Sequence, residues 1–173
     1  MTTHDPVHER SSDATGYRRA ERLSHALYGL IIVTATLVAE RIHVTEPLHA
    51  LGLLMGTAVV LLLAHTYSAV IATRTVEGRP LGSAGRRLVV LDNLPVLFAV
   101  IIPAVLFLLA AAEVMTLRTA YTASIAFSVA SLFALGLYEG RTTASMGWAG
   151  SILSGAAAGA IGIVVVAVEA FFE

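Results

Sequence analysis

The stretch LVVLDNLPVLFAVIIPAVLFLLAAA, Leu88–Ala112, has one charged residue, Asp92, in 25 positions. A helix needs about 20 predominantly apolar residues to cross a hydrocarbon core about 30 Å thick, so this stretch predicts a membrane-spanning helix. Its residues are apolar on every side, whereas the strands of a membrane barrel would alternate apolar and polar residues. The pattern therefore indicates an all-α membrane protein.

Four further apolar stretches of sufficient length accompany it. We expect five transmembrane helices, at about residues 23–42, 48–73, 88–112, 118–138 and 145–171. They would form one polytopic bundle over residues 22–173, after a polar, mobile cytoplasmic tail at residues 1–21. The composition agrees, because 57% of the residues are hydrophobic and 13% are charged, about half the charged share of a soluble domain. Such a composition excludes a disordered chain, and the absence of cysteine excludes disulfides and thiolate metal sites.

The arginines predict the orientation of the bundle. All eleven basic residues are arginines, and nine lie in or beside the tail, the 74–87 loop and the 139–144 loop, which five spans place on one side. Arg41 and Arg118 lie on the other side. Because cytoplasmic loops carry the excess of basic residues, we expect a cytoplasmic N-terminus and an outside C-terminus. The lysine-free, Ala-, Val- and Gly-rich composition is typical of a GC-rich bacterium, which indicates a bacterial cell membrane.

Polar residues inside the spans are the first candidates for function, because ionisable groups in a membrane are costly. The expected topology brings residues of four helices into the cytoplasmic half of the membrane. A pocket centred on His65 and Asp92 would exchange protons near neutral pH or handle a cation. The alternative is a polar cluster that only cross-links the helices by hydrogen bonds. The candidate pocket residues are His25, Tyr28, His65, Asp92, Asn93 and Tyr138.

A second polar pattern, E-x-x-H-x-x-E-x-x-H, lies on the expected outer side. It consists of Glu40, His43, Glu46 and His49. Carboxylate and imidazole side chains three residues apart resemble the metal ligands of helical bundles and suit Zn, Fe or Mn. Pro47 interrupts the segment, so the four cannot share one helical face, and the alternative is a set of solvated loop charges. The sequence requires no cofactor.

Small residues and prolines predict how the helices pack. Ser151, Gly155 and Gly159 form a small-xxx-small seam that lets another helix approach closely, either within one subunit or between two. We expect a homo-oligomer, because a single bundle of this size is small. Pro95 and Pro103 would kink the third helix and free the carbonyls of residues 91 and 99.

Two segments carry a family resemblance. Leu23–Glu40 (LSHALYGLIIVTATLVAE) and Leu62–Ala72 (LLAHTYSAVIA) resemble a family of uncharacterised actinobacterial small multi-pass integral membrane proteins, with "HALYG" and "AHxY" helices. The resemblance implies importance for His25, Tyr28, Gly29, His65 and Tyr67, and no activity comes with it. Arg22–Leu37 is faintly similar to the first helix of TMEM175-like potassium channels, although the Phe-Ser-Asp of that motif is missing here.

Two functions fit these patterns. One is a small transporter or channel that handles protons or cations through a cytoplasm-side pocket. The alternative is a non-transporting protein that binds a partner complex or lipid through the small-residue seam. An enzyme acting on lipid is a weaker third option, because the sequence has no dinucleotide, Walker, nucleophile-elbow or HExxH motif. The chain has no basic face for nucleic acid.

Overall fold

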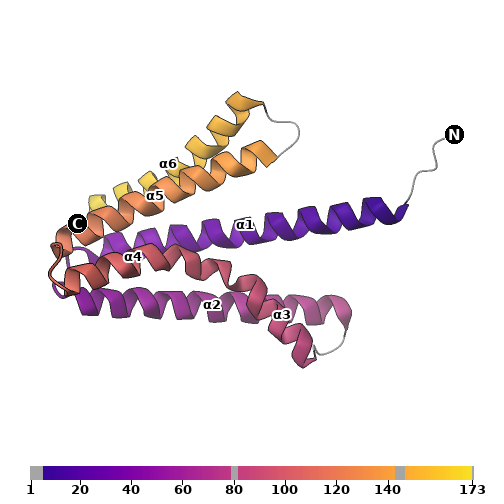
Figure 1. Cartoon of the computed structure of the whole chain (residues 1–173), viewed down its shortest axis with the longest axis horizontal. Helices are drawn as coiled ribbons and strands as arrows, with labels where there is room; N and C mark the ends of the chain where they lie inside the picture. The colour runs from indigo at the N-terminus through magenta and orange to yellow at the C-terminus, as the bar shows by residue number, and fades with distance from the viewer. Residues whose placement is uncertain (1–5, 79–81, 143–146, 173) are drawn as a thin grey trace.

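The computed structural model describes residues 6–78, 82–142 and 147–172, without the side chains of residues 6–22, Asp92, Asn93 and several others near helix ends. This part of the chain contains six helices and no strand, so the all-α prediction is confirmed. The helices are α1 (Pro6–Glu40), α2 (Pro47–Glu77), α3 (Ser83–Asn93), α4 (Pro95–Ala111), α5 (Leu117–Thr142) and α6 (Trp148–Phe172) (Figure 1).

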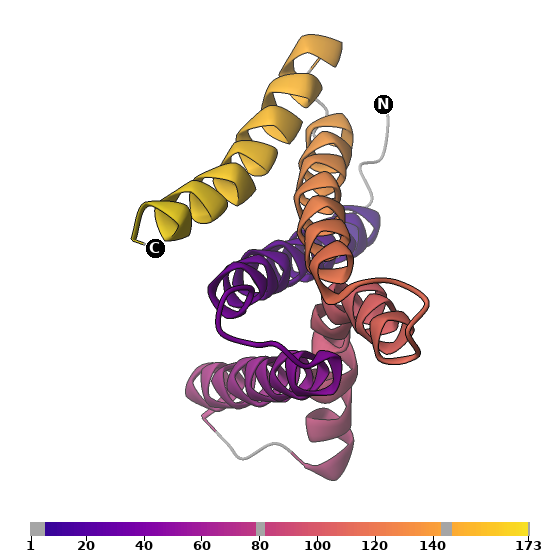
Figure 2. The same ribbon diagram turned by 90° about the vertical axis from the view of Figure 1, so that its left-hand side faces the viewer.

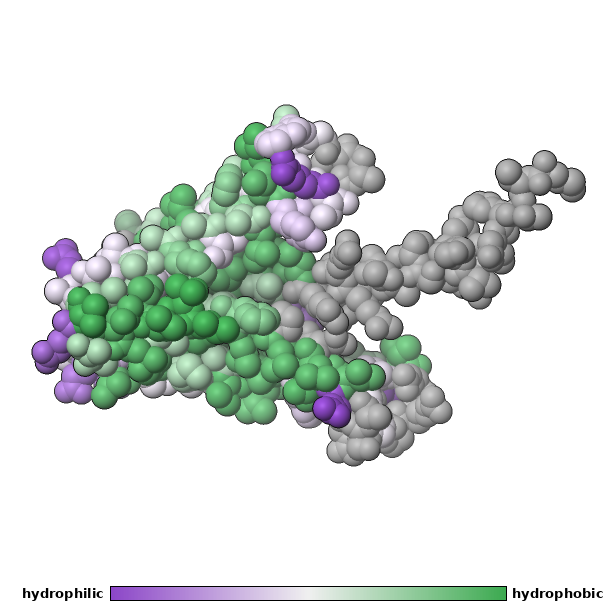
Figure 3. Space-filling model, viewed as in Figure 1, coloured by the Kyte–Doolittle hydropathy of each residue, from purple (hydrophilic) through white to green (hydrophobic). Residues whose placement is uncertain are grey.

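Four of these helices are long and apolar enough to cross a membrane. The candidate spans are Leu23–Glu40, Pro47–Val76, Leu117–Thr142 and Trp148–Val168. Large apolar side chains such as Val60, Leu63 and Phe98 lie exposed on the outside, and hydrophobic surface covers the middle of the bundle while hydrophilic residues gather at its ends (Figure 3). Soluble proteins rarely expose so large an apolar surface. The chain is a multi-pass membrane protein.

The region expected as the third span differs from the prediction. The helix does not run unbroken over residues 88–112 but is divided into α3 and α4 at Leu94, where α3 turns away from α4 (Figure 1). Pro95 has no N–H to donate back into α3. The Leu91 carbonyl instead accepts a 3.4 Å bond from the Leu94 N–H, only three residues along. The proline thus ends one helix and begins the next.

The first helix is also longer than expected. α1 begins at Pro6, so its backbone takes in most of the segment assigned above to a polar tail. The apolar part, Leu23–Glu40, is the candidate span, and the mobility of the preceding segment stays a prediction.

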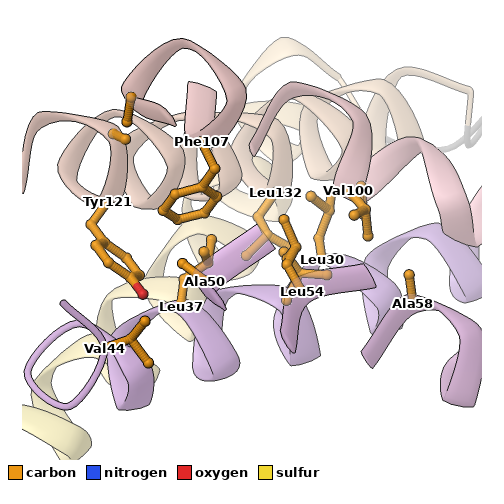
Figure 4. Close-up of a cluster of buried hydrophobic side chains, with 14 residues drawn as sticks. Leu30, Leu37, Val44, Ala50, Leu54, Ala58, Val100, Phe107, Tyr121 and Leu132 are labelled. Carbon is orange, nitrogen blue, oxygen red and sulfur yellow. The ribbon is translucent and has the colours of Figure 1, made fainter. Parts of the chain in front are cut away.

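α1 is the central helix of the bundle. It packs against each of the other five helices, and it lies between the α2–α4 pair and the α5–α6 pair (Figures 1 and 2). The core where α1, α2, α4 and α5 meet includes Leu37, Leu54, Phe107, Tyr121 and Leu132 (Figure 4). The remaining faces of the outer helices carry the exposed apolar side chains.

α4 ends in a Schellman motif with an uncommon residue. The Val114 N–H donates to the Leu109 carbonyl at 2.9 Å, and the Glu113 N–H donates to the Ala110 carbonyl at 3.1 Å. Glu113 has a φ of 61°, a left-handed conformation that glycine usually supplies at this position. The strain is local and lies outside the core.

Candidate functional site

The candidate site lies where α1 and α2 run side by side. His25 and His65 face each other, with ring centroids 5.1 Å apart and ring planes at 79°. Tyr28, one turn after His25 on α1, lies 5.2 Å from the His65 ring. All three belong to candidate membrane spans. The structure therefore brings together three of the six residues that the sequence assigned to a polar pocket.

The orientation of His65 is set by a backbone contact. Its Nδ1 atom lies 2.9 Å from the carbonyl oxygen of Leu61, one turn earlier in α2. A carbonyl only accepts a hydrogen bond, so Nδ1 of the neutral ring carries the hydrogen and donates it. The other nitrogen, Nε2, then keeps its lone pair and is available to take up a proton or bind a cation.

A cavity of about 420 Å³ opens beside these rings. Its wall combines the polar groups of five side chains with two apolar ones, and its volume is ample for several water molecules. Its lining residues are Ser24, His25, Tyr28, Leu61, Ala64, His65 and Ser68. Ser68 follows His65 by one turn and so shares its helical face.

A second cavity, of about 350 Å³, adjoins the first at α1. It reaches α5, and Ser24 and Tyr28 line both cavities. The second cavity is lined by Leu23, Ser24, Leu27, Tyr28, Ile31 and Glu139. α1 therefore presents one polar edge, Ser24 and Tyr28, between the histidine pair and a carboxylate.

Glu139, rather than Tyr138, is the α5 residue that the structure brings to this region. Tyr138 is 53% exposed and lines neither cavity. Glu139 lines the second cavity, and its Oε2 accepts a 3.1 Å hydrogen bond from the Ser154 hydroxyl of α6. The buried face of α5 includes Ser128, Leu132 and Gly136. This face continues at Gly140, whereas Glu139 is exposed beside it, so the helical spacing alone would not have identified Glu139.

The predicted partner of His65 lies in a region without described side chains. Asp92 and Asn93 are the last two residues of α3, and their side chains are outside the described part of the chain. The pairing of His65 with Asp92 therefore stays a prediction.

The four residues of the acidic and histidine pattern are not gathered into one site. Glu40 ends α1, exposed His43 lies in the following turn, Glu46 caps α2, and exposed His49 begins it. The His43 Nδ1 lies 3.1 Å from the Ala39 carbonyl. Within the described residues, no group of three or more histidines or carboxylates could hold a metal ion. The turn before Pro47 separates the two halves of the pattern.

The small-residue seam of α6 packs inside the chain. Ser151, Gly155 and Gly159 are buried, and a Cβ atom on Gly155 would lie 3.0 Å from the Phe133 carbonyl of α5. α5 carries a G-x-x-x-G pair of its own, Gly136 and Gly140, and both glycines are buried against α6. The sequence analysis missed this pair, although its spacing of four was visible.

Comparison with protein-family models, curated proteins and solved structures gave no match to this chain. The residues around the two cavities offer two imidazoles, a phenol, a carboxylate and two hydroxyls within a membrane protein. This set is suited to taking up protons or small cations.

Proposed function

We propose that this chain is a small membrane transporter or channel that passes protons or small cations through a polar pocket on its cytoplasmic side. The observation that supports it is the His25–His65 pair, which lines an open cavity between two candidate membrane spans. Histidine is the side chain whose charge changes most readily near neutral pH. Polar residues at this depth are rarely retained for packing alone.

In this proposal α3 and α4 together cross the membrane once, so the chain has five membrane crossings. The start of α1, the junction of α2 with α3 and the junction of α5 with α6 then share one side. Figure 1 draws the start of α1, the ends of α2 and α5 and the starts of α3 and α6 at the same end of the bundle. Nine of the eleven arginines belong to these segments, which favours the cytoplasm for this end. Arg141 lies 4.0 Å over the Trp148 ring there, a pair typical of a membrane interface.

The histidine pair would hold one positive charge at a time, because two unit charges about 5 Å apart repel by about 3 kcal/mol at an effective dielectric constant near 20. In this scheme Nε2 of His65 accepts the charge, and the tilted Tyr28 ring lies 5.2 Å from the His65 ring. Ser24 and Ser68 then offer hydroxyls that carry the proton or hold a cation along the cavity.

The seam alternative is less favoured, because its premise was an unoccupied small-residue face. Ser151, Gly155 and Gly159 are covered by α5 of the same chain. A partner could reach them only by displacing α5. The histidine cavity, in contrast, is open to occupation without any rearrangement of the helices.

Flux measurements in liposomes test the proposal. Purified protein is reconstituted, and proton, Na⁺ and K⁺ fluxes are followed under an imposed gradient in each direction. We expect flux above that of empty liposomes, lost in His65→Gln and reduced in His25→Gln. His49→Gln is the matched control, since His49 is exposed at the start of α2, at the other end of the bundle. Flux equal to that of empty liposomes for every ion would refute the proposal.

A further inference from the structure

Three hydroxyl groups are buried along one face of α5 at the end of the bundle opposite the histidine pair. Tyr121 is 1% exposed, and Ser124 and Ser128 are 0% exposed. Their spacing of three and then four residues aligns them on one helical face. None of the three hydroxyl oxygens has a hydrogen-bond partner among the described residues. We call these residues the hydroxyl tract.

A carboxylate stands at the entrance of the hydroxyl tract. Glu40 ends α1, and its Oε2 atom is buried without a hydrogen-bond partner among the described residues. Its backbone carbonyl accepts a 3.0 Å hydrogen bond from the Val44 N–H. The Tyr121 ring is held in place by Phe107, edge-on at 4.8 Å and 73°, and its hydroxyl points toward the α1–α2 turn near Val44 (Figure 4). Glu40 and Tyr121 thus lie where the buried hydroxyl tract meets the outer end of the bundle.

α4 supplies a further acceptor along the tract. The contact between Phe107 and Tyr121 fixes the register of the two antiparallel helices, so Pro103 and Ala99 lie at about the levels of Ser124 and Ser128. Pro103 is inside α4 and buried. Because proline has no N–H, the Ala99 carbonyl receives no helical hydrogen bond from it. The Ala99 carbonyl, at about the level of Ser128, thus lacks the helical hydrogen bond that the residue four places on normally donates.

So many unpaired polar groups need a partner. Each buried polar group left without a hydrogen bond costs about 1–3 kcal/mol, and buried water usually satisfies such groups by making 2–4 bonds to them. We propose that the hydroxyl tract is a hydrated half-path that admits water and protons from the outer side, entering at Glu40 and ending at Ser128. The site is built from α1, α4 and α5, and it takes water rather than a metal ion.

An apolar layer closes the inner end of the half-path. One turn beyond Ser128, Leu132 of α5 is buried beside Leu30 of α1 in the same core cluster (Figure 4). Directly against this layer lies the cavity of Glu139, whose wall extends along α1 from Leu23 to Ile31. The role of the tract in transport rests on the proposed function, in which Leu30 and Leu132 separate the outer water from the histidine pair. The hydration of the tract does not depend on the proposed function.

Hydroxyl-radical labelling in lipid nanodiscs, mapped by mass spectrometry, tests hydration directly. Radicals formed from water at the tract should label the Tyr121 ring in the full wild-type chain. The double variant Ser124→Ala with Ser128→Ala should lose this labelling. Ser151→Ala is the matched control, because that buried serine already donates to the Gly147 carbonyl at 3.4 Å, and it should leave Tyr121 labelling unchanged.

The outcomes separate the two proposals. An unlabelled Tyr121 in the wild-type chain would show a dry interface and overturn the hydrated half-path, whatever the variants do. Labelled Tyr121 without ion flux in liposomes would support the half-path and refute transport. If both hold, the double serine variant should also lose proton flux. Circular dichroism of each variant checks that the helices are retained, and Ser124→Thr, which keeps the hydroxyl, should preserve labelling.

Discussion

The imidazole rings of His25 and His65 lie 5.1 Å apart, edge to face, on two helices that meet inside the membrane spans. The Leu61 carbonyl fixes the His65 ring by accepting a hydrogen bond from its Nδ1. The pair thus has one defined orientation, with Nε2 of His65 as the reactive nitrogen. The chemistry proposed for the cavity depends on that single contact.

In the neutral His65 ring, the hydrogen should therefore be on Nδ1. ¹⁵N chemical shifts of selectively labelled histidine in bicelles distinguish the two tautomers of neutral imidazole, with His65→Gln used to assign the signals. We expect the Nδ1–H form for His65, because the Leu61 carbonyl accepts from that atom. Finding the Nε2–H form would contradict the assignment of Nε2 as the proton acceptor.

Glu139 should matter for flux, and Tyr138 should not. Glu139→Gln keeps an oxygen for the Ser154 hydroxyl but removes the charge beside Ser24 and Tyr28. We expect lower cation flux in proteoliposomes for Glu139→Gln and unchanged flux for Tyr138→Phe, since Tyr138 lines neither cavity. The reverse order of effects would mean that the second cavity is not part of the path.

The contact between α5 and α6 should be sensitive to a single methyl group. A Cβ on Gly140 would lie 2.6 Å from the Ser151 Cα, so Gly140→Ala must push the two backbones apart. Overpacking of this kind typically costs about 1–3 kcal/mol. Unfolding in mixed detergent micelles measures the loss, and Gly56→Ala is the matched control because nothing lies within 4 Å of its added Cβ. Equal stability of the two variants would argue against the close packing.

Glu113→Gly should stabilise the chain. The left-handed conformation at φ 61° costs an L-residue about 1–2 kcal/mol, and glycine loses part of this gain through its greater freedom in the unfolded chain. We expect a net increase of about 0.5–1 kcal/mol in the free energy of unfolding. Glu113→Ala keeps the Cβ and serves as the control, with little change. A destabilised Glu113→Gly would show that the carboxylate has a role of its own.

Local sequence rules explain part of the fold and of the site. The apolar stretches predicted the four spanning helices, and the missing N–H of Pro95 accounts for the break at Leu94, although a kink rather than two helices was expected. His25, Tyr28 and His65 were identified by depth alone. Tyr138 was chosen over Glu139 because topology gives depth but not the rotation of a helix, and one residue turns the side chain by about 100° around the helix axis.

The sequence by itself determined that this chain lies in a membrane. The free energy of transferring a helix into lipid depends on how many apolar side chains it has and on how long the apolar stretch is. The sequence also identified the few polar residues that interrupt the apolar stretches. Only the tertiary structure decided which of them meet: His25 with His65, Ser154 with Glu139, Gly140 with Ser151. Such pairs depend on helix rotation and register, which are set by the packing of all six helices together and leave no trace in the hydropathy of any one of them.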